Sequence, residues 1–332
     1  MPADGAVLVT GGAGYVGSHV VWALVEAGYR IVVLDDLSTG FRDAVAAEAT
    51  FVEGDAGDTA LVDTLIGEQG IDAVVHLAAS SLVEESMARP LEYYRNNVVK
   101  TRELIAACLA HDIRHFVFSS SAAVYGAPAE QPILEDSPKV PANPYGRSKL
   151  MCEWMLQDAG AFAALRYVAM RYFNVAGADP SGRTGESTAH ATHLIKVASQ
   201  AVVGIRDHIE IYGEDYPTPD GTCVRDYIHA SDVADAHVAA LVHLRGGGES
   251  LTLNCGYQRG YSVREVLAAV ERVAGRSLDI RSASRRPGDP PELIAATARI
   301  VETLGWRPRH DDLDVIVQSA IDWEKKLATK VE

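Results

Sequence analysis

A tyrosine and a lysine four residues apart are the side chains of this sequence best suited to proton chemistry. Tyr145 and Lys149 lie in PYGRSKL, and a spacing of four places both on one face of a helix. A free phenol titrates near pH ~10 and is a poor base at neutrality, but an ammonium one turn away lowers that pKa. Tyr145 is therefore the predicted acid/base, and Ser121 of FSSSAAVYG is the hydroxyl predicted to hold the reacting oxygen.

A glycine-rich turn near the N-terminus indicates that a dinucleotide cofactor binds near these residues. TGGAGYVG places Gly11, Gly14 and Gly17 between an apolar run and a helical pattern. Glycine lets the backbone approach a pyrophosphate, which the following helix N-terminus attracts. Asp35 ends the next apolar run, where a carboxylate accepts the ribose hydroxyls of NAD and repels the 2′-phosphate of NADP. The positive nicotinamide ring of such a cofactor would reinforce a nearby lysine in favouring the phenolate.

The YxxxK spacing alone is usually a half-buried tyrosine beside a solvated lysine. Here the glycine turn, a serine-rich strand end and YGRSK follow one another in the order that a dinucleotide-dependent active site requires. The order of the three segments therefore favours the catalytic interpretation.

The elements that must position these residues alternate between short β-rich runs and helical patterns. Buried strands are expected at residues 6–10, 30–35, 50–53, 72–77, 115–119 and 165–171, and helices at residues 15–27, 59–68, 97–111 and 145–158. Because the runs are almost continuously apolar, they predict an α/β fold with a doubly wound, Rossmann-type parallel sheet. Ligands bind at the carboxyl edge of such a sheet. Asp55, after the third strand, is either a turn aspartate or a contact to the adenine amino group.

The second half of the chain predicts a smaller α/β substrate domain. Residues 174–191 are rich in Gly, Pro, Ser and Thr and are expected to form a long functional loop. Helices are expected near residues 192–203, 231–243 and 313–327, and strands near residues 209–212 and 251–254. The expected division is an NAD-binding domain over residues 1–175, to which residues 225–255 return, and a substrate domain over residues 176–332.

Composition and charge exclude several classes of protein. The formal net charge of −15 argues against nucleic acid as a partner, although a few local cations still allow an anionic small molecule. Four cysteines without metal-ligand spacing predict reduced thiols and no metal site. No apolar run approaches ~20 residues, and MPADGAVLVTGG lacks a basic segment ahead of an apolar one. We therefore expect a cytoplasmic protein that does not enter a membrane.

Six segments distributed along the chain resemble the UDP-glucose 4-epimerases of the extended short-chain dehydrogenase/reductase family. They are TGGAGYVGSH, PLEYYRNNV, FSSSAAVYG, PYGRSKLMCEWML, RYFNVAGADPSG and YGEDYPTPDGTCVRDYIHASDVADAH. The last segment is the most specific, because it lies outside the dinucleotide-binding fold. The resemblance covers essentially the whole chain. It implies tightly bound NAD, a UDP-hexose substrate, reversible C4 epimerisation through a 4-keto sugar, and a homodimer.

The resemblance also implies roles for individual residues. Ser121, Tyr145 and Lys149 take the catalytic positions. The cofactor contacts fall on Gly11, Gly14, Tyr15, Val16, Gly17, Asp35, Asp36, Asp55, Ala56, Leu77, Ala78, Ala79, Ser81, Asn96, Ser119, Tyr145, Lys149 and Phe173. The substrate contacts fall on Ser121, Tyr145, Asn174, His193, Leu194, Tyr212, Arg225, Arg286, Asp289 and Leu293. Two arginines in this set suit a pyrophosphate, because guanidinium binds phosphate oxygens in a bidentate manner.

Several residues depart from the pattern of this family. Ser81 stands in place of a lysine, His193 of an asparagine, Lys196 of a proline and Ala296 of an aspartate. Leu293 stands where glucose-restricted members carry a bulky tyrosine beside C2 of the hexose. The smaller leucine predicts additional activity on UDP-GlcNAc and UDP-GalNAc, unless neighbouring side chains fill the gap.

Three other functions stay open at this stage. A UDP-pentose 4-epimerase of the same family would differ in the sugar alone. A nucleotide-sugar 4,6-dehydratase needs an acid and a base just before Val–Tyr–Gly, where this chain has Ala122 and Ala123. A non-catalytic, NAD-sensing regulator could use the same fold, but it could dispense with the Tyr145–Lys149 pair that this chain retains.

Overall fold

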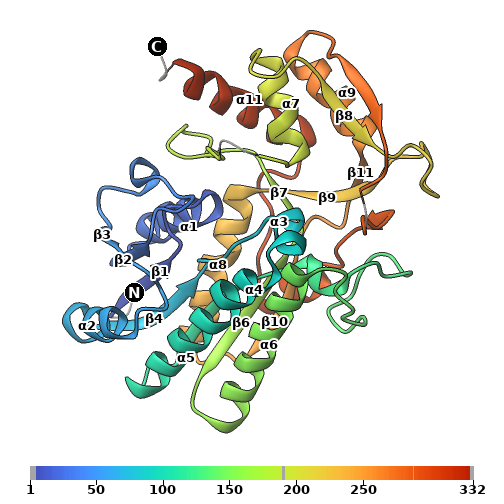
Figure 1. The fold of residues 1–332 in the computed structure, drawn as a ribbon. Coiled ribbons are helices and arrows are strands. Elements are labelled where there is room, and N and C mark those ends of the chain that lie inside the picture. Colours follow the sequence, from blue (N-terminus) through green and yellow to red (C-terminus); the bar gives the residue numbers. More distant parts are fainter. Residues whose placement is uncertain (1–4, 189–190, 287, 330–332) are drawn as a thin grey trace.

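A computed structural model describes residues 5–188, 191–286 and 288–329. Its largest element is a parallel sheet of seven strands (Figure 1). The strands are β1 (Ala6–Thr10), β2 (Ile31–Asp35), β3 (Thr50–Glu53), β4 (Ile71–His76), β5 (His115–Ser121), β6 (Arg166–Tyr172) and β10 (Leu251–Cys255). They lie in the order β3-β2-β1-β4-β5-β6-β10, and every neighbouring pair is parallel. The predicted doubly wound sheet is confirmed.

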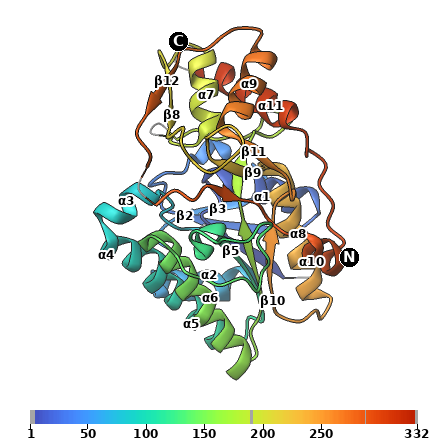
Figure 2. The same cartoon turned by 90° about the vertical axis from the view of Figure 1, so that its right-hand side faces the viewer.

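Alternate residues of the strands form two cores, because successive side chains point to opposite faces of the sheet. Val7 and Val9 face one core, and Ala6 and Leu8 face the other. The first core is covered by α1 (Tyr15–Glu26), α8 (Ala230–Arg245) and α10 (Ala298–Leu304), and the second by α2 (Thr59–Gln69), α5 (Lys100–Ala110) and α6 (Pro144–Phe162). Figure 2 shows these helices on the two sides of the sheet.

The start of α6 is defined by its sequence. Asn143 is the N-cap, and its side-chain oxygen accepts a hydrogen bond of 2.8 Å from the Gly146 amide. Pro144 follows at the first helical position, where its missing N–H costs nothing. This cap fixes Tyr145 in the first turn of α6, at the carboxyl edge of the sheet.

Between β4 and α5 the chain forms three short helical elements that the sequence patterns did not resolve. They are α3 (Val83–Ala88), α4 (Pro90–Tyr93) and η2 (Tyr94–Val99), which has π-helical geometry. The helix expected over residues 97–111 therefore becomes a regular α-helix only at Lys100. Two further short elements are η1 (Arg42–Ala44) and η3 (Ala122–Tyr125).

A second group of elements follows β6. Its four-stranded sheet contains β7 (Asn174–Ala176), β9 (Val224–His229), β11 (Gly260–Ser262) and β13 (Glu292–Leu293), and a two-stranded sheet pairs β8 (Ile209–Tyr212) with β12 (Ile280–Ala283). Their core packs against α7 (Leu194–Val202), α9 (Val263–Ala274) and α11 (Leu313–Thr329) (Figure 1). In the described ranges, no helix is both long enough and apolar enough to cross a membrane.

The prediction of a loop over residues 174–191 is wrong at its beginning. Asn174–Ala176 forms β7, which pairs in parallel with β9. A strand of three residues is too short to show a periodic pattern. The polar, glycine-rich composition of the segment also favours a loop. Residues 189 and 190 of the expected loop lie outside the described residues.

Candidate active site

Ser121, Tyr145 and Lys149 come together where β5 ends and α6 begins. The side chain of Ser121 lies close enough to the phenol of Tyr145 to lower its pKa. The Lys149 ammonium donates to the Ser119 carbonyl at 2.9 Å and lies 5.0 Å from the centroid of the Phe118 ring. Tyr145 and Lys149 are buried. The structure thus brings the three predicted catalytic residues to one place.

Burial dominates the electrostatics of this cluster. Burial raises the pKa of Tyr145 above its ordinary value, and the neighbouring side chain of Ser121 opposes that rise. Burial also lowers the pKa of Lys149 to about 8, while Cys152 and Glu153 act in the opposite direction. The expectation that Lys149 lowers the pKa of Tyr145 does not hold for the protein alone, because Lys149 is directed at the Ser119 carbonyl and desolvation of the phenol prevails.

The glycine turn is tightly built. Gly11 has φ +73, and a Cβ there would lie 2.5 Å from the backbone nitrogen of Ala78. A Cβ at Gly17 would lie 2.0 Å from the Gly11 carbonyl oxygen. Gly14 is the N-cap of α1 and contributes no side-chain cap. Tyr15 and Val16 follow in the first turn, so unpaired amides of α1 face the space above the turn, which suits a pyrophosphate.

The predicted acidic contacts differ in their surroundings. Asp35 is buried, and its two carboxylate oxygens accept hydrogen bonds of 2.9 Å from the amides of Ala13 and Leu37. Asp36 is exposed and bonds the amide of Ser38 at 3.0 Å. Asp55 caps the Gly57 amide at 2.8 Å and pairs with Lys100 at 2.8 Å. These contacts are those of a turn aspartate, and a contact between Asp55 and adenine stays a prediction.

The segment after β4 is held by a residue that the sequence analysis missed. The side chain of Asn97 accepts from the Ser80 amide at 2.8 Å, donates to the Ser80 carbonyl at 2.9 Å and donates to Ser148 on α6 at 3.0 Å. It thereby fixes the predicted contacts Leu77, Ala78, Ala79 and Ser81 relative to α6. The neighbouring Asn96, also a predicted contact, bonds the Ser80 hydroxyl at 2.9 Å. A pair of asparagines inside a helical segment is the sequence signal for such a role.

Four of the predicted substrate residues form a second cluster. The Arg286 guanidinium lies 4.0 Å from the centroid of the Tyr212 ring. Arg225 donates to the Val224 carbonyl at 2.8 Å and lies 3.5 Å from the carboxylate of Asp289. Arg286 also approaches Glu84 of α3 at 3.5 Å, which links this cluster to the first half of the chain.

Leu293 connects the two clusters. It lies opposite Arg225 in the pairing of β13 with β9. Its side chain packs against a core that contains Ala122, Val124 and the predicted cofactor contact Phe173. Position 293 therefore lies between the arginines and the end of β5. The buried Ala56 follows β3 in the turn before α2, and the half-buried Asn174 is the first residue of β7.

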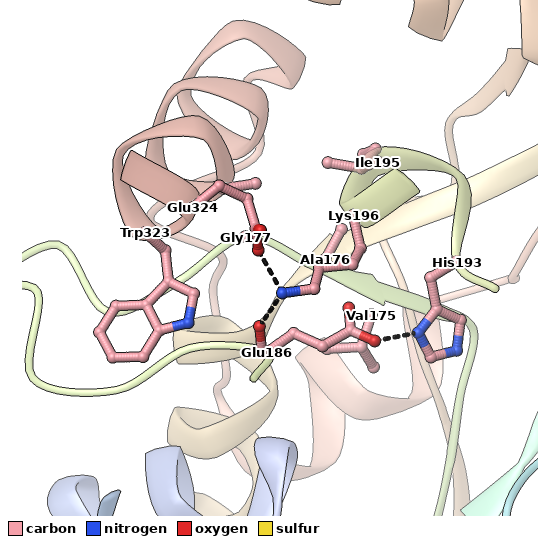
Figure 3. Close-up of a pocket in the computed structure, with 10 residues that line it drawn as sticks. Val175, Ala176, Gly177, Glu186, His193, Ile195, Lys196, Trp323 and Glu324 are labelled. Carbon is pink, nitrogen blue, oxygen red and sulfur yellow. Dashed lines mark hydrogen bonds and ion pairs between the residues drawn. The ribbon is translucent and has the colours of Figure 1, made fainter. Parts of the chain in front are cut away.

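His193 lies just before α7 with a partner that the sequence analysis also missed. Its Nδ1 is 2.7 Å from a carboxylate oxygen of Glu186, and 53% of its side chain is exposed. Lys196, one of the departures from the family pattern, is buried and bonds both the Glu186 carbonyl and the Glu324 carboxylate (Figure 3). Leu194 is half-buried at the first position of α7. Among the described residues, no cluster of three or more His, Cys, Asp or Glu could hold a metal ion.

A dinucleotide-type glycine turn and a Ser–Tyr–Lys set at the carboxyl edge of a doubly wound sheet define an enzyme of the short-chain dehydrogenase/reductase class. Comparison with known proteins narrows this class. Residues 7–256 match the model of the NAD dependent epimerase/dehydratase family. Because the match covers most of the chain, the chain belongs to this family.

Individual relatives agree with this assignment over their full length. A UDP-glucose 4-epimerase of Azospirillum brasilense is 59% identical over 325 residues, which cover 98% of this chain and 93% of the relative. The crystal structure of UDP-glucose 4-epimerase from Brucella ovis in complex with NAD matches with a TM-score of 0.93 and 47% identity, over 96% of this chain and 98% of the other. The UDP-Glc/GlcNAc 4-epimerase of Campylobacter jejuni matches with a TM-score of 0.85 and 44% identity, over 97% and 100%.

Proposed function

We propose that this chain is an NAD-dependent UDP-hexose 4-epimerase that interconverts UDP-glucose and UDP-galactose. The observation that carries the proposal is the meeting of Ser121, at the end of β5, with Tyr145 and Lys149, one helical turn apart on α6, at the carboxyl edge of the sheet. UDP-glucose 4-epimerases are similar to this chain over nearly all of its length.

The residues of the glycine turn fit NAD. Gly11 and Gly17 leave no room for a Cβ, so the backbone of the turn can approach a pyrophosphate closely. The buried carboxylate of Asp35 uses each oxygen once, towards the amides of Ala13 and Leu37, and keeps a lone pair for a ribose hydroxyl. When bound there, NAD would supply the hydride chemistry at C4 of the sugar.

The chain itself contributes proton transfer and orientation. Ser121 binds the C4 hydroxyl oxygen, and Tyr145 takes its proton as the carbonyl of the 4-keto sugar forms. Tyr145 returns the proton when the opposite face of the keto sugar is presented. The bond of Lys149 to the Ser119 carbonyl fixes its ammonium at the end of β5, one helical turn from Tyr145. Because the overall reaction is redox-neutral, one bound cofactor serves many turnovers.

If the nucleotide is bound firmly and the sugar loosely, the 4-keto sugar can present either of its faces to the cofactor. Arg225 and Arg286 are the groups we assign to the pyrophosphate, since an anionic ligand in a protein of net charge −15 needs local cations. Tyr212 orients Arg286 by contact with its guanidinium. His193, Asn174 and Leu194 are assigned to the rest of the UDP moiety.

Position 293 bears on which sugars are accepted besides UDP-glucose and UDP-galactose. Leu293 is smaller than tyrosine and half-buried, and we infer that UDP-GlcNAc and UDP-GalNAc are additional substrates. The similarity to a UDP-Glc/GlcNAc 4-epimerase supports this inference. A 4,6-dehydratase is not favoured, because Ala122 and Ala123 bring no carboxylate to the end of β5.

We also propose that the protein is a homodimer and that it is located in the cytoplasm. Large apolar side chains are exposed on neighbouring elements α4, η2 and α6, among them Leu91 (78% exposed), Val99 and Trp154 (53% exposed). They support a homodimer, which light scattering coupled to size-exclusion chromatography tests. The four cysteines are free and buried, in keeping with the reducing conditions of the cytoplasm.

The experiment is an epimerisation assay on UDP-glucose, UDP-GlcNAc and UDP-xylose side by side. Conversion of UDP-glucose to UDP-galactose without added cofactor is the expected result. Conversion of UDP-xylose alone would instead identify a pentose epimerase, and absence of all conversion by NAD-containing protein would favour a regulator.

A further inference from the structure

Glu153 of α6 and Arg171 of β6 form an ion pair one helical turn beyond Lys149. The guanidinium and the carboxylate meet in two bonds, Nε to Oε1 at 2.8 Å and Nη2 to Oε2 at 2.6 Å, and both side chains are buried. Taking two charges out of water is expensive, and apolar side chains at such positions are often no less stabilising. Stability alone therefore gives no reason for this pair.

The geometry of α6 relates the pair to catalysis. Tyr145, Lys149 and Glu153 are spaced by four residues, so they follow one another along one face of the helix. Each is directed at one of three successive serines of β5. Lys149 donates to the carbonyl of Ser119 at 2.9 Å, and Glu153 accepts from the hydroxyl of Ser120 at 2.5 Å. The phenol of Tyr145 lies beside the side chain of Ser121.

The other side of Ser121 is held by the same pair. The Nη1 of Arg171 donates to the hydroxyl of Tyr125 at 2.7 Å and to the carbonyl of Glu135 at 2.9 Å. Tyr125 belongs to η3, which begins directly after Ser121. The Glu153–Arg171 pair thus fixes the chain on both sides of Ser121.

We propose that Glu153, held by Arg171, is a positioning residue that sets the distance between Ser121 and Tyr145. The proposal rests on the proposed epimerase activity. A shift of one ångström between reacting groups can cost a large factor in rate, so a loosened Ser121–Tyr145 contact should appear in kcat. Substrate affinity should not change, because Glu153 is assigned no contact with the nucleotide.

The charge of Glu153 gives the proposal a second observable. Burial lowers the pKa of Lys149 to about 8, and the Glu153 carboxylate opposes this effect. The titratable groups near Lys149 include Tyr145 and Cys152 on its own helix and His76 on β4, whose pKa burial lowers to about 3, so that it is neutral. Removing the negative charge at position 153 should therefore let Lys149 lose its proton at lower pH.

The test compares pH profiles of kcat and KM for UDP-galactose in wild type and Glu153→Gln, which keeps the size of the side chain and removes its charge. We expect kcat to fall at least ~10-fold at pH 7, KM to stay the same, and the alkaline limb of kcat to move to lower pH. Glu135→Gln is the matched control. This variant neutralises another buried carboxylate of the same hydrogen-bond network. The alkaline limb of its kcat profile should remain at the wild-type pH.

A double variant separates positioning from packing. Glu153→Met with Arg171→Met replaces the pair by apolar side chains of similar length, which should preserve folding. If this variant regains wild-type kcat and the wild-type alkaline limb, the pair is merely structural and the proposal is wrong. Ser120→Ala leaves the pair intact and removes one bond, and an unchanged kcat there would contradict the positioning of Ser121. Absence of turnover in the wild type would instead refute the proposed function.

Discussion

Lys149 donates its hydrogen bond to the backbone carbonyl of Ser119, 2.9 Å away, and not to the phenol that it is expected to assist. The ammonium therefore ties α6 to the end of β5. Lys149→Met should lower kcat by at least ~10². It should also reduce the NAD that copurifies, since Lys149 is a predicted cofactor contact. Lys325→Met, a change at an exposed lysine on α11, should leave both unchanged.

The measurement for this variant is turnover together with the absorbance of bound cofactor. A Lys149→Met protein that keeps normal turnover and full NAD occupancy would show that the ammonium has no part in either.

Asp35 is predicted to select NAD over NADP. Its carboxylate is buried at the end of β2 and would lie against the 2′-phosphate of NADP. Asp35→Ala should therefore lower NAD retention, whereas Asp43→Ala, at an exposed carboxylate nearby, should not. The cofactor released on denaturation is identified by mass. Recovery of mainly NADP from the wild type would refute this role of Asp35.

Buried histidines predict loss of stability in mild acid. Burial lowers the pKa of His76 and His229 to about 3, and of His19 and His237 to about 4, from an ordinary value of 6.5. At pH values between the folded and the unfolded pKa, the unfolded chain binds four more protons at the four histidines than the folded chain. The free energy of unfolding therefore falls as pH drops below ~6.5. Asp226, whose pKa burial raises to about 6, opposes this by one proton. For these five groups alone, the net three protons correspond to about 4 kcal/mol per pH unit at most.

Urea unfolding at pH 7 and pH 5 measures this effect. The midpoint should be clearly lower at pH 5, and His237→Gln, which removes one of the four sites, should weaken the dependence. Equal midpoints at the two pH values would mean that these histidines do not remain neutral in the folded protein.

Position 293 is predicted to determine sugar size. Leu293→Tyr should abolish conversion of UDP-GlcNAc and spare that of UDP-galactose, because the larger ring would fill the space beside C2 of the hexose. Leu293→Met keeps the volume similar and should retain both activities. The assay is the ratio of the two rates for each variant. If the wild type consumes UDP-galactose without any N-acetyl turnover, side chains around Leu293 already close that space.

The sequence predicted the central sheet well for a physical reason. Its strands are buried on both faces, so AVLVT and IVVLD are almost entirely apolar. Such short apolar runs are typical of buried parallel strands. The short strands β7, β11 and β13 have three residues or fewer, which is too few for any periodicity, and the π-helical η2 differs from an α-helix in hydrogen bonding alone. These elements were not predicted.

The catalytic residues were accessible from the sequence because Tyr145 and Lys149 lie on one helix with a fixed spacing. Their supporting residues were not, since Glu153 and Arg171 are 18 positions apart and meet through the packing of α6 on the sheet. The pKa of Tyr145 was also beyond sequence reasoning. Its direction depends on how far the phenol is buried, which spacing does not reveal.

The central claim is that Tyr145 transfers the proton of the C4 hydroxyl, and Tyr145→Phe tests it most directly. The substitution keeps the ring and removes the ionisable oxygen. The measurement is kcat for UDP-galactose at pH 7, with bound NAD and UDP affinity determined on the same preparation. We predict that kcat falls by at least ~10² while NAD content and UDP affinity stay at wild-type values. A Tyr145→Phe enzyme with near-normal turnover would contradict the mechanism.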